Sequence, residues 1–322
     1  MGLSIREWLV APLCALSALL LCNGSALAWT RPGHMVTAAI AYDELMTSDP
    51  KIVDRIIEIM ASHPEPAPFQ VAIGRELNTE RSQRIFLEIP RWADDVRGGE
   101  YSHPTWHYAI RPVIDREDPP SQETADVISG SAFEALALNI DVAKDPRAAA
   151  SERAVALCWI FHIVGDIHQP LHTGELHSRQ FPDGDFGGDK FYLLDPKSGQ
   201  PVKLHWFWDD AVHDRAEPEA ALERARALMA KLPRARFAKE LARDRKHPAD
   251  IQNWAAESYA VAKSVAYRAD RPRAISPDQA KRPSDAYVTD SIAVAEQRLT
   301  VAGYRLTDVL RMIFSNEGAA PR

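Results

Sequence analysis

The chain has 322 residues, of which 46% are apolar and 26% are charged, and its formal net charge is −7. This composition is typical of a globular protein, and the length is sufficient for one large domain or two small ones. The acidic balance argues against a protein that holds nucleic acid on a broad basic surface. It leaves open an enzyme whose positive charge comes from bound metal.

Residues 1–28 have the pattern of a secretory signal peptide. Arg6 supplies a positive charge, an apolar stretch covers residues 8–21, and Ala26-Leu27-Ala28 is a small-x-small cleavage site. The apolar stretch is too short for a good membrane anchor. We therefore expect an exported protein, periplasmic or secreted, that begins at Trp29 and has no stable membrane anchor.

The cysteines are consistent with this interpretation. Cys14 and Cys22 lie in the signal peptide, so Cys158 remains alone and the mature chain has no internal disulfide. Lipid attachment at Cys22 is the alternative, but Leu20-Leu21 before it lack the small residue that lipoprotein cleavage usually requires. We expect Cys158 to be an inert core residue.

Apolar residues recur at helical spacing along most of the mature chain, which predicts a mainly helical fold. The segments with this pattern are Gly33–Met46, Lys51–Ser62, Ser131–Lys144, Ser151–Asp166, Glu217–Leu232, Ala249–Ala269 and Tyr287–Phe314.

Strand-like sequence is scarce. Phe191–Leu194 and Val202–Leu204 predict a small hairpin, and the segment Arg111–Thr124 is predicted to be a loop. There is no internal repeat and no low-complexity linker. The fold class expected is all-α, a single mainly helical domain over residues 29–315 with at most a short β-hairpin, followed by a tail at 316–322.

The strongest chemical signal is the run Phe161–His172. His162 and Asp166 are four residues apart in a predicted helix, so both side chains project from one face. Pro170 ends the helix, and His172 is then free to turn towards a neighbouring site.

A second pair, His205 and Asp209, has the same spacing. Taken singly, such a pair is more often a surface ion pair than a metal site. Imidazole nitrogen combined with a carboxylate nevertheless suits Zn²⁺ better than Ca²⁺.

Two further motifs add metal-binding and phosphate-binding side chains. Asp94 precedes Arg97, and an arginine binds phosphate well through its planar fork of donors. His107 stands beside the aromatic Tyr108, and the mature chain opens with the segment Trp29–His34.

In this order, these motifs resemble those of the secreted trinuclear-zinc nucleases of fungi, plants and bacteria, the S-one/P-one type. The resemblance covers essentially the whole mature chain, as far as Ala302–Leu306 in the last predicted helix. It implies the helical fold that this family shares with zinc phospholipases C.

The resemblance also implies three zinc ions per chain, each with its own ligands. One zinc would be held by Asp94, His107, His162 and Asp166. A second would be held by the bridging Asp166, by His34, and by the backbone amine and carbonyl of Trp29. The third would be held by His172, His205 and Asp209.

The implied role of Trp29 is chemically reasonable. A free α-amino group titrates near pH 8, which is low enough for zinc to displace its proton. Only a newly cut N-terminus presents that amine, so cleavage after Ala28 becomes part of site assembly. Three zinc ions bring about +6 of charge and the three aspartates return about −3, so an acidic protein would still attract phosphate.

We expect metal-assisted hydrolysis of phosphodiester bonds in single-stranded DNA and RNA. The resemblance implies products with 5′-phosphate ends and 3′-nucleotidase activity as well. Asp94, Asp166 and Arg97 would act in catalysis, with Arg97 stabilising transition-state charge, and Tyr108 matches the family's base-stacking aromatic.

Two positions depart from the family pattern. Asp189 stands where an asparagine is usual after two glycines, so we expect it in the substrate site with an altered effect. Ile110 replaces a carboxylate that selects bases, so base preference does not carry over. The sequence indicates no oligomer, and a monomer is the default.

Two other functions remain open at this stage. A zinc phospholipase C shares the fold and the N-terminal tryptophan, but its last ligand pair is typically His-x-x-x-Glu, whereas this chain has Asp209. A zinc-storage protein would bind metal without turnover and would leave Arg97 and Tyr108 unexplained.

Overall fold

The computed structural model describes residues 29–70, 79–212, 217–244, 247 and 249–315. The predicted signal peptide, residues 1–28, and the predicted tail, residues 316–322, lie outside the described residues.

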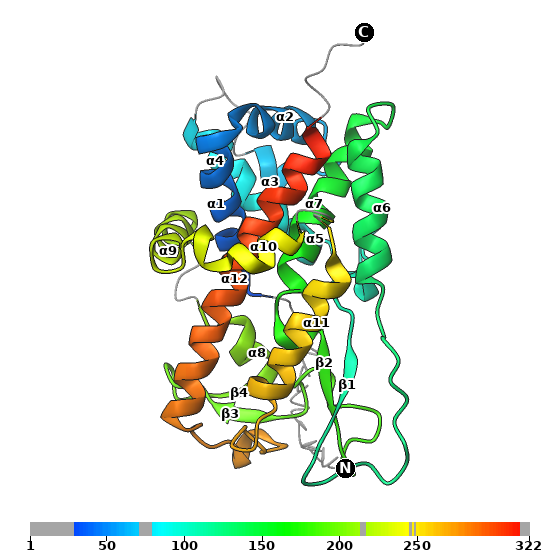
Figure 1. Cartoon of the computed structure of the whole chain (residues 1–322), viewed down its shortest axis with the longest axis vertical. Helices are drawn as coiled ribbons and strands as arrows, with labels where there is room; N and C mark the ends of the chain where they lie inside the picture. Colours follow the sequence, from blue (N-terminus) through cyan, green and yellow to red (C-terminus); the bar gives the residue numbers. More distant parts are fainter. Residues whose placement is uncertain (1–28, 71–78, 213–216, 245–246, 248, 316–322) are drawn as a thin grey trace, which may run out of the picture.

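Helices make up most of the described chain (Figure 1). In chain order, the α-helices are α1 (Arg31–Ser48), α2 (Pro50–Met60), α3 (Ala67–Gln70), α4 (Thr79–Glu88), α5 (Trp92–Asp95), α6 (Ala132–Lys144), α7 (Ala150–Asp166), α8 (Leu204–Asp209), α9 (Pro218–Lys231), α10 (Ala238–Asp244), α11 (Ile251–Val261) and α12 (Asp285–Phe314).

Short turns of other helix types and four short strands connect them. The 3₁₀ turns are η1 (Ile89–Arg91), η2 (Pro104–His107), η3 (Pro170–His172), η4 (Arg234–Phe237) and η6 (Pro277–Gln279), and η5 (Ala262–Ala266) is a π-helical turn. The strands are β1 (Arg111–Ile114), β2 (Gly174–His177), β3 (Tyr192–Leu194) and β4 (Pro201–Lys203).

The core is built around α1, α7 and α12. Helix α7 is buried on every side from Ala156 to Asp166, as its unbroken apolar sequence requires. Helix α12 runs along the length of the molecule and packs against α1 and α7 (Figure 1). The predicted all-helical fold class is confirmed, because each segment with helical spacing forms a helix over most of its length.

Local sequence explains where several helices begin. Pro50 occupies the first turn of α2, where its missing N–H is not needed. The hydroxyl of Ser284 accepts the Tyr287 amide at the start of α12, and the carboxylate of Asp250 accepts the Asn253 amide at the start of α11. Helix α11 ends earlier than predicted, because its chain changes to the π-helical turn η5.

The predicted hairpin is present as the antiparallel pair β3 and β4, with Tyr192 opposite Lys203. The prediction that Arg111–Thr124 is entirely a loop is wrong. Its first residues form β1, which pairs in parallel with β2 so that Arg111 lies opposite Gly174. Pro112 cannot donate to a ladder, and the partner strand is distant in sequence, so local pattern did not reveal this pair.

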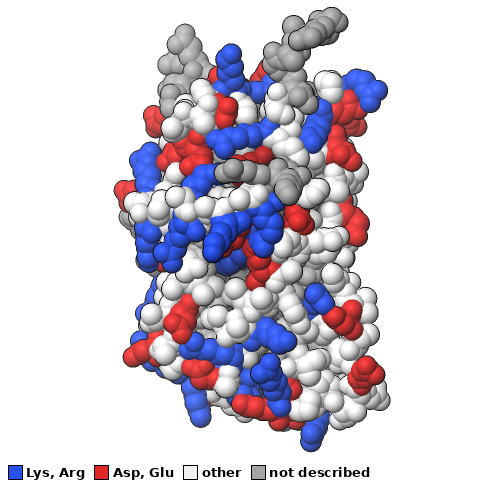
Figure 2. Space-filling view, viewed as in Figure 1, with Lys and Arg blue, Asp and Glu red and all other residues white. Residues whose placement is uncertain are grey.

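The outer surface carries charges of both signs. On the face shown in Figure 2, basic residues gather in a band at mid-height, and acidic residues lie among and around them. Arg224 of α9 pairs with Glu296 at 2.7 Å, and Arg226 lies 3.5 Å from Asp43. Among the described residues, no helix combines the length and apolarity needed to cross a bilayer.

A buried ion-pair network joins helices α10, α11 and α12. Glu257 of α11 accepts hydrogen bonds from Arg298 at 3.0 Å and from Arg305 at 2.8 Å, both on α12. Arg305 is fully buried and also contacts Asp244 at 2.8 Å and the imidazole of His168 at 2.8 Å. Burial alone would raise the pKa of Glu257, but the two arginines lower it to about 2.

We expect Glu257→Gln to lose about 3 kcal/mol of unfolding free energy at neutral pH. The folded pKa of Glu257 lies below its ordinary value of 4.5. The stabilisation is therefore present above pH 4.5 and disappears as the pH falls through 2. Urea unfolding at several pH values measures this, and a difference between wild type and variant that does not shrink in acid would contradict it.

Candidate metal centre

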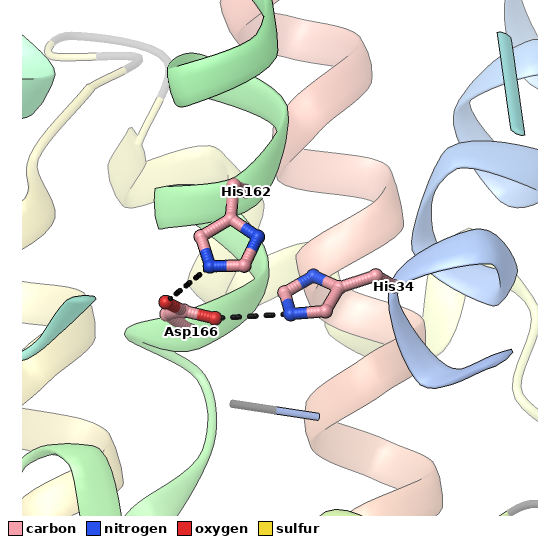
Figure 3. Close-up of side chains that lie close together, drawn as sticks. All are labelled: His34, His162 and Asp166. Atoms are coloured by element: carbon pink, nitrogen blue, oxygen red, sulfur yellow. Dashed lines mark ion pairs between the residues drawn. The ribbon is translucent and has the colours of Figure 1, made fainter. Parts of the chain in front are cut away.

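Three predicted ligands meet where α1 passes α7. His162 and Asp166 project from one face of α7, and His34 reaches them from α1 (Figure 3). The carboxylate of Asp166 lies between the two rings, with Oδ1 3.1 Å from Nε2 of His34 and Oδ2 2.9 Å from Nε2 of His162. All three side chains are fully buried.

Two more predicted ligands join this cluster from other elements. His107 ends η2, and its Nδ1 lies 3.1 Å from Oδ2 of Asp166 and 2.8 Å from Nε2 of His162. Asp94 of α5 contributes a carboxylate whose Oδ1 lies 3.8 Å from Nε2 of His162 and 3.9 Å from Nδ1 of His107.

A separate group contains the remaining side-chain ligands. The Nε2 atoms of His172 and His205 are 3.2 Å apart, and Oδ2 of Asp209 lies 3.4 Å from Nε2 of His205. His172 ends η3, whereas His205 and Asp209 share one face of α8. The structure thus brings together all eight predicted side-chain ligands. Two of the groups share His162 and form the first cluster, and His172, His205 and Asp209 form a separate third group.

The ring orientations show which nitrogen faces each group. Nδ1 of His162 donates to the carbonyl of Pro90, Nδ1 of His172 to that of His107, and Nδ1 of His205 to that of Gly187, each at 2.7 Å. A carbonyl accepts a hydrogen bond only from a nitrogen that bears a proton, so in the neutral ring, the form that binds metal, Nε2 has a lone pair that points into the group. Metal-binding histidines are typically oriented in this way.

These groups fit a metal better than they fit hydrogen bonding. In the first cluster, Nδ1 of His34 has no hydrogen-bond partner, and the 3.1 Å approach of its Nε2 to Oδ1 of Asp166 lacks hydrogen-bond geometry. Buried polar atoms without partners are costly, and a cation would satisfy them. A mixed set of imidazole nitrogens and carboxylate oxygens suits zinc.

Burial and charge shift the pKa values of these groups in different directions. Burial would lower the pKa of His162, but Asp166 and Asp94 together raise it to about 9. Burial lowers the pKa of His172 to about 3 and raises that of Asp209 well above its ordinary value. The first cluster is therefore strongly charged, while the group around Asp209 is held near neutrality.

Trp29 lies beside the first cluster. Its side chain is fully buried, and its indole Nε1 donates to the carbonyl of Gly165 at 2.9 Å, one residue before Asp166. The predicted start of the mature chain is therefore packed against the C-terminal end of α7, close to the side chains that it was predicted to join.

A cleft of about 630 Å³ opens beside both groups. Its lining includes His107, His172 and His205, together with the predicted substrate residues Arg97, Tyr108 and Asp189. The guanidinium of Arg97 donates to Oδ1 of Asp94 through Nη2 at 2.7 Å and Nε at 3.1 Å. Arg97 therefore borders the cleft while it orients Asp94.

Asp189 does not stand alone in this cleft. Its Oδ2 lies 3.2 Å from Nζ of Lys203, which immediately precedes α8. The lysine offsets the negative charge that the sequence introduces at this position, so repulsion of a substrate phosphate is weaker than the substitution alone predicts.

Several residues of the site were not found by sequence reasoning. Gln169, inside the histidine-rich run, donates from Nε2 to Oδ1 of Asp209 at 2.7 Å. Phe186 borders the cleft, is 57% exposed and has φ of +55°, beside the glycine pair at 187 and 188. The glycines mark this tight loop in the sequence, whereas only the fold shows that it borders the cleft.

Comparisons with known proteins agree with this site. The model of the family described as S1/P1 Nuclease matches residues 29–315. Endonuclease 3 of Arabidopsis thaliana is 25% identical over 338 residues, which cover 98% of this chain and 97% of the relative. Nuclease S1 of Aspergillus oryzae (strain ATCC 42149 / RIB 40) is 32% identical over 146 residues, 42% of this chain and 44% of the relative.

The helical fold and the clustered histidines and aspartates define a class of metal-dependent hydrolases. The chain belongs to the S1/P1 nuclease family. This membership confirms the family resemblance inferred from the motifs, and it supports hydrolytic nuclease activity.

Gly165 provides a test of the metal centre that changes no predicted ligand. A Cβ at this position would lie 2.8 Å from Nδ1 of His34. Gly165→Ala should favour the helix by about 1 kcal/mol, yet displace His34 and lower the content of bound metal in the purified protein. Elemental analysis measures the metal and circular dichroism measures the helix, and a folded variant with an unchanged metal content would contradict the prediction.

Proposed function

We propose that this protein is an exported, monomeric, zinc-dependent endonuclease with 3′-nucleotidase activity. It hydrolyses phosphodiester bonds in single-stranded DNA and RNA and leaves 5′-phosphate ends. The observation that carries the proposal is the convergence of eight histidine and aspartate side chains, three of which line a cleft, in a chain of the S1/P1 nuclease family.

The described groups support three zinc sites. Asp94, His107, His162 and Asp166 would hold the first ion. Asp166, His34, and the amine and carbonyl of Trp29 would hold the second, and His172, His205 and Asp209 the third. Bound zinc supplies an activated water near neutral pH and positive charge for the scissile phosphate.

Arg97 would act directly on the substrate from the wall of the cleft. Nη2 and Nε of the Arg97 guanidinium donate to Asp94, which leaves Nη1 of Arg97 to bind a phosphate oxygen. An arginine held by a carboxylate is pre-organised, so it stabilises developing charge without a large loss of side-chain freedom.

The residues that line the cleft support single-stranded substrates. Tyr108, Ile110 and Phe186 provide apolar and aromatic surface along its lining. A base that is not paired in a duplex can stack on such surface, and base–aromatic stacking contributes roughly 1–3 kcal/mol per base. Stacking on Tyr108 would place the adjacent phosphate near the zinc-binding groups.

Asp166→Asn tests the shared carboxylate. An amide cannot provide two anionic oxygens to two ions, so we expect the variant to lose nearly all activity on a single-stranded oligonucleotide and to hold fewer than three zinc ions. Asp141→Asn, an exposed carboxylate on α6, is the matched control and should behave like wild type. Substantial turnover by Asp166→Asn would refute the bridging role.

Arg97→Ala separates catalysis from metal binding. We expect kcat to fall on the order of 100-fold, because one donor to the transition state is removed, while the zinc content stays near three. Arg97→Lys keeps the charge but not the planar fork, so it should recover only part of the rate. A variant that loses zinc would reassign Arg97 to the metal centre.

The products that the protein releases distinguish the nuclease from the phospholipase alternative. A nuclease releases acid-soluble nucleotides from single-stranded DNA or RNA, whereas a phospholipase C releases a phosphorylated headgroup from phosphatidylcholine. Headgroup release without nucleotide release would overturn the proposal, and bound zinc with neither product would favour the storage function.

A further inference from the structure

Asp209 belongs to the third metal group and also contacts the predicted start of the mature chain. Its carboxylate faces His205 and Gln169, while its backbone carbonyl accepts the amide of Thr30 at 3.2 Å. The residue is 3% exposed and lies at the C-terminal end of the six-residue helix α8. A shift of this short helix would therefore move both contacts together.

The Thr30 amide matters because of the peptide bond to which it belongs. The Trp29–Thr30 peptide is planar, so the direction of the Thr30 N–H also determines the direction of the Trp29 carbonyl. The carbonyl of Asp209 therefore orients the proposed carbonyl ligand of the second zinc. Trp29 has little room to move, because it packs closely against Gly33. A Cβ added at Gly33 would lie 2.8 Å from the Cβ of Trp29.

Gln169 fixes the other side of Asp209. Its Nε2 donates to Oδ1 of Asp209 at 2.7 Å, which leaves Oδ2 for the side of His205. Its Oε1 accepts the amide of Leu171 in η3, the turn that ends at His172. One fully buried amide thus positions ligands from both elements of the third group.

We propose that Gln169, Asp209 and Thr30 form a positioning relay that couples the third metal group to the docking of the mature N-terminus. The inference rests on the ligand assignment of the proposed function. Coupling between two sites is reciprocal, so an ion in the third group strengthens docking by the factor by which docking strengthens ion binding. Gln169 and Thr30 are positioning residues and need not touch substrate.

Reactivity of the α-amine reports on docking without any measurement of catalysis. The zinc-loaded mature protein is treated with an acylating reagent, and acylation of the Trp29 amine is followed by intact mass and peptide mapping. A docked, metal-bound amine reacts slowly. Gln169→Leu and His172→Ala both change the third group, and neither side chain forms a hydrogen bond to Thr30 or Trp29 in the described structure. Gln169→Leu is the cleaner variant, because His172 also donates to the carbonyl of His107 in the first cluster.

We expect both variants to raise the acylation rate of the Trp29 amine by at least about fivefold, the lower range of typical coupling between sites. Thr30→Pro should do the same, because proline lacks the donated N–H although φ of −49° at Thr30 suits it. Thr30→Val keeps the N–H and loses only a 3.4 Å hydroxyl contact to Asp209, so it should match wild type.

Equal acylation rates in wild type, His172→Ala and Gln169→Leu would overturn the relay, provided that circular dichroism shows folded variants. A rate for Thr30→Val as high as that for Thr30→Pro would also overturn it. Oligonucleotide hydrolysis by wild type is measured separately. If wild type cuts no oligonucleotide while the amine still responds to the third group, the proposed function fails and the relay stands.

Discussion

Three imidazoles share the carboxylate of Asp166 in the interior of the protein, and much of the surrounding structure is needed to hold them there. His34, His107 and His162 come from three different elements, and each lies within 3.1 Å of an Asp166 oxygen. Charges placed this deeply are unfavourable unless they are compensated. The large apolar core around α7 offsets that cost, and a bound cation would remove it.

Backbone carbonyls have a second role in this arrangement beyond their secondary structure. The carbonyls of Pro90, His107 and Gly187 orient the rings of His162, His172 and His205. The carbonyls of Gly165 and Asp209 hold Trp29 and Thr30, the predicted start of the mature chain. The parallel strands β1 and β2 contribute as well, because they follow His107 and His172 closely and hold the turns that carry them side by side. A few residues of sheet thus align ligands in a helical protein.

The distribution of charge resolves an apparent conflict between composition and activity. The chain has a net charge of −7, and α9 carries its arginines in pairs with acidic neighbours. The arginines of α9 are therefore not a free basic surface for nucleic acid. Positive charge at the cleft comes from Arg97, from Lys203 beside Asp189 and, on the proposed function, from zinc.

The sequence by itself determined the fold class, the family and which side chains meet in the candidate metal centre. Helical spacing identifies His162 with Asp166 and His205 with Asp209 as neighbours on one helix face, because this depends only on local geometry. The order of the motifs then indicated which other residues join them. Those predictions needed no knowledge of how distant segments pack.

Tertiary structure alone decided what depends on contacts between distant segments. Three contacts join segments that no local pattern relates. They are the pairing of β1 with β2, the hydrogen bond of Gln169 to Asp209, and the ion pair of Lys203 with Asp189. The same holds for the carbonyl of Asp209 that receives Thr30. Backbone carbonyls are identical in every residue, so the sequence does not mark which of them orients a ligand, and only the folded chain selects it.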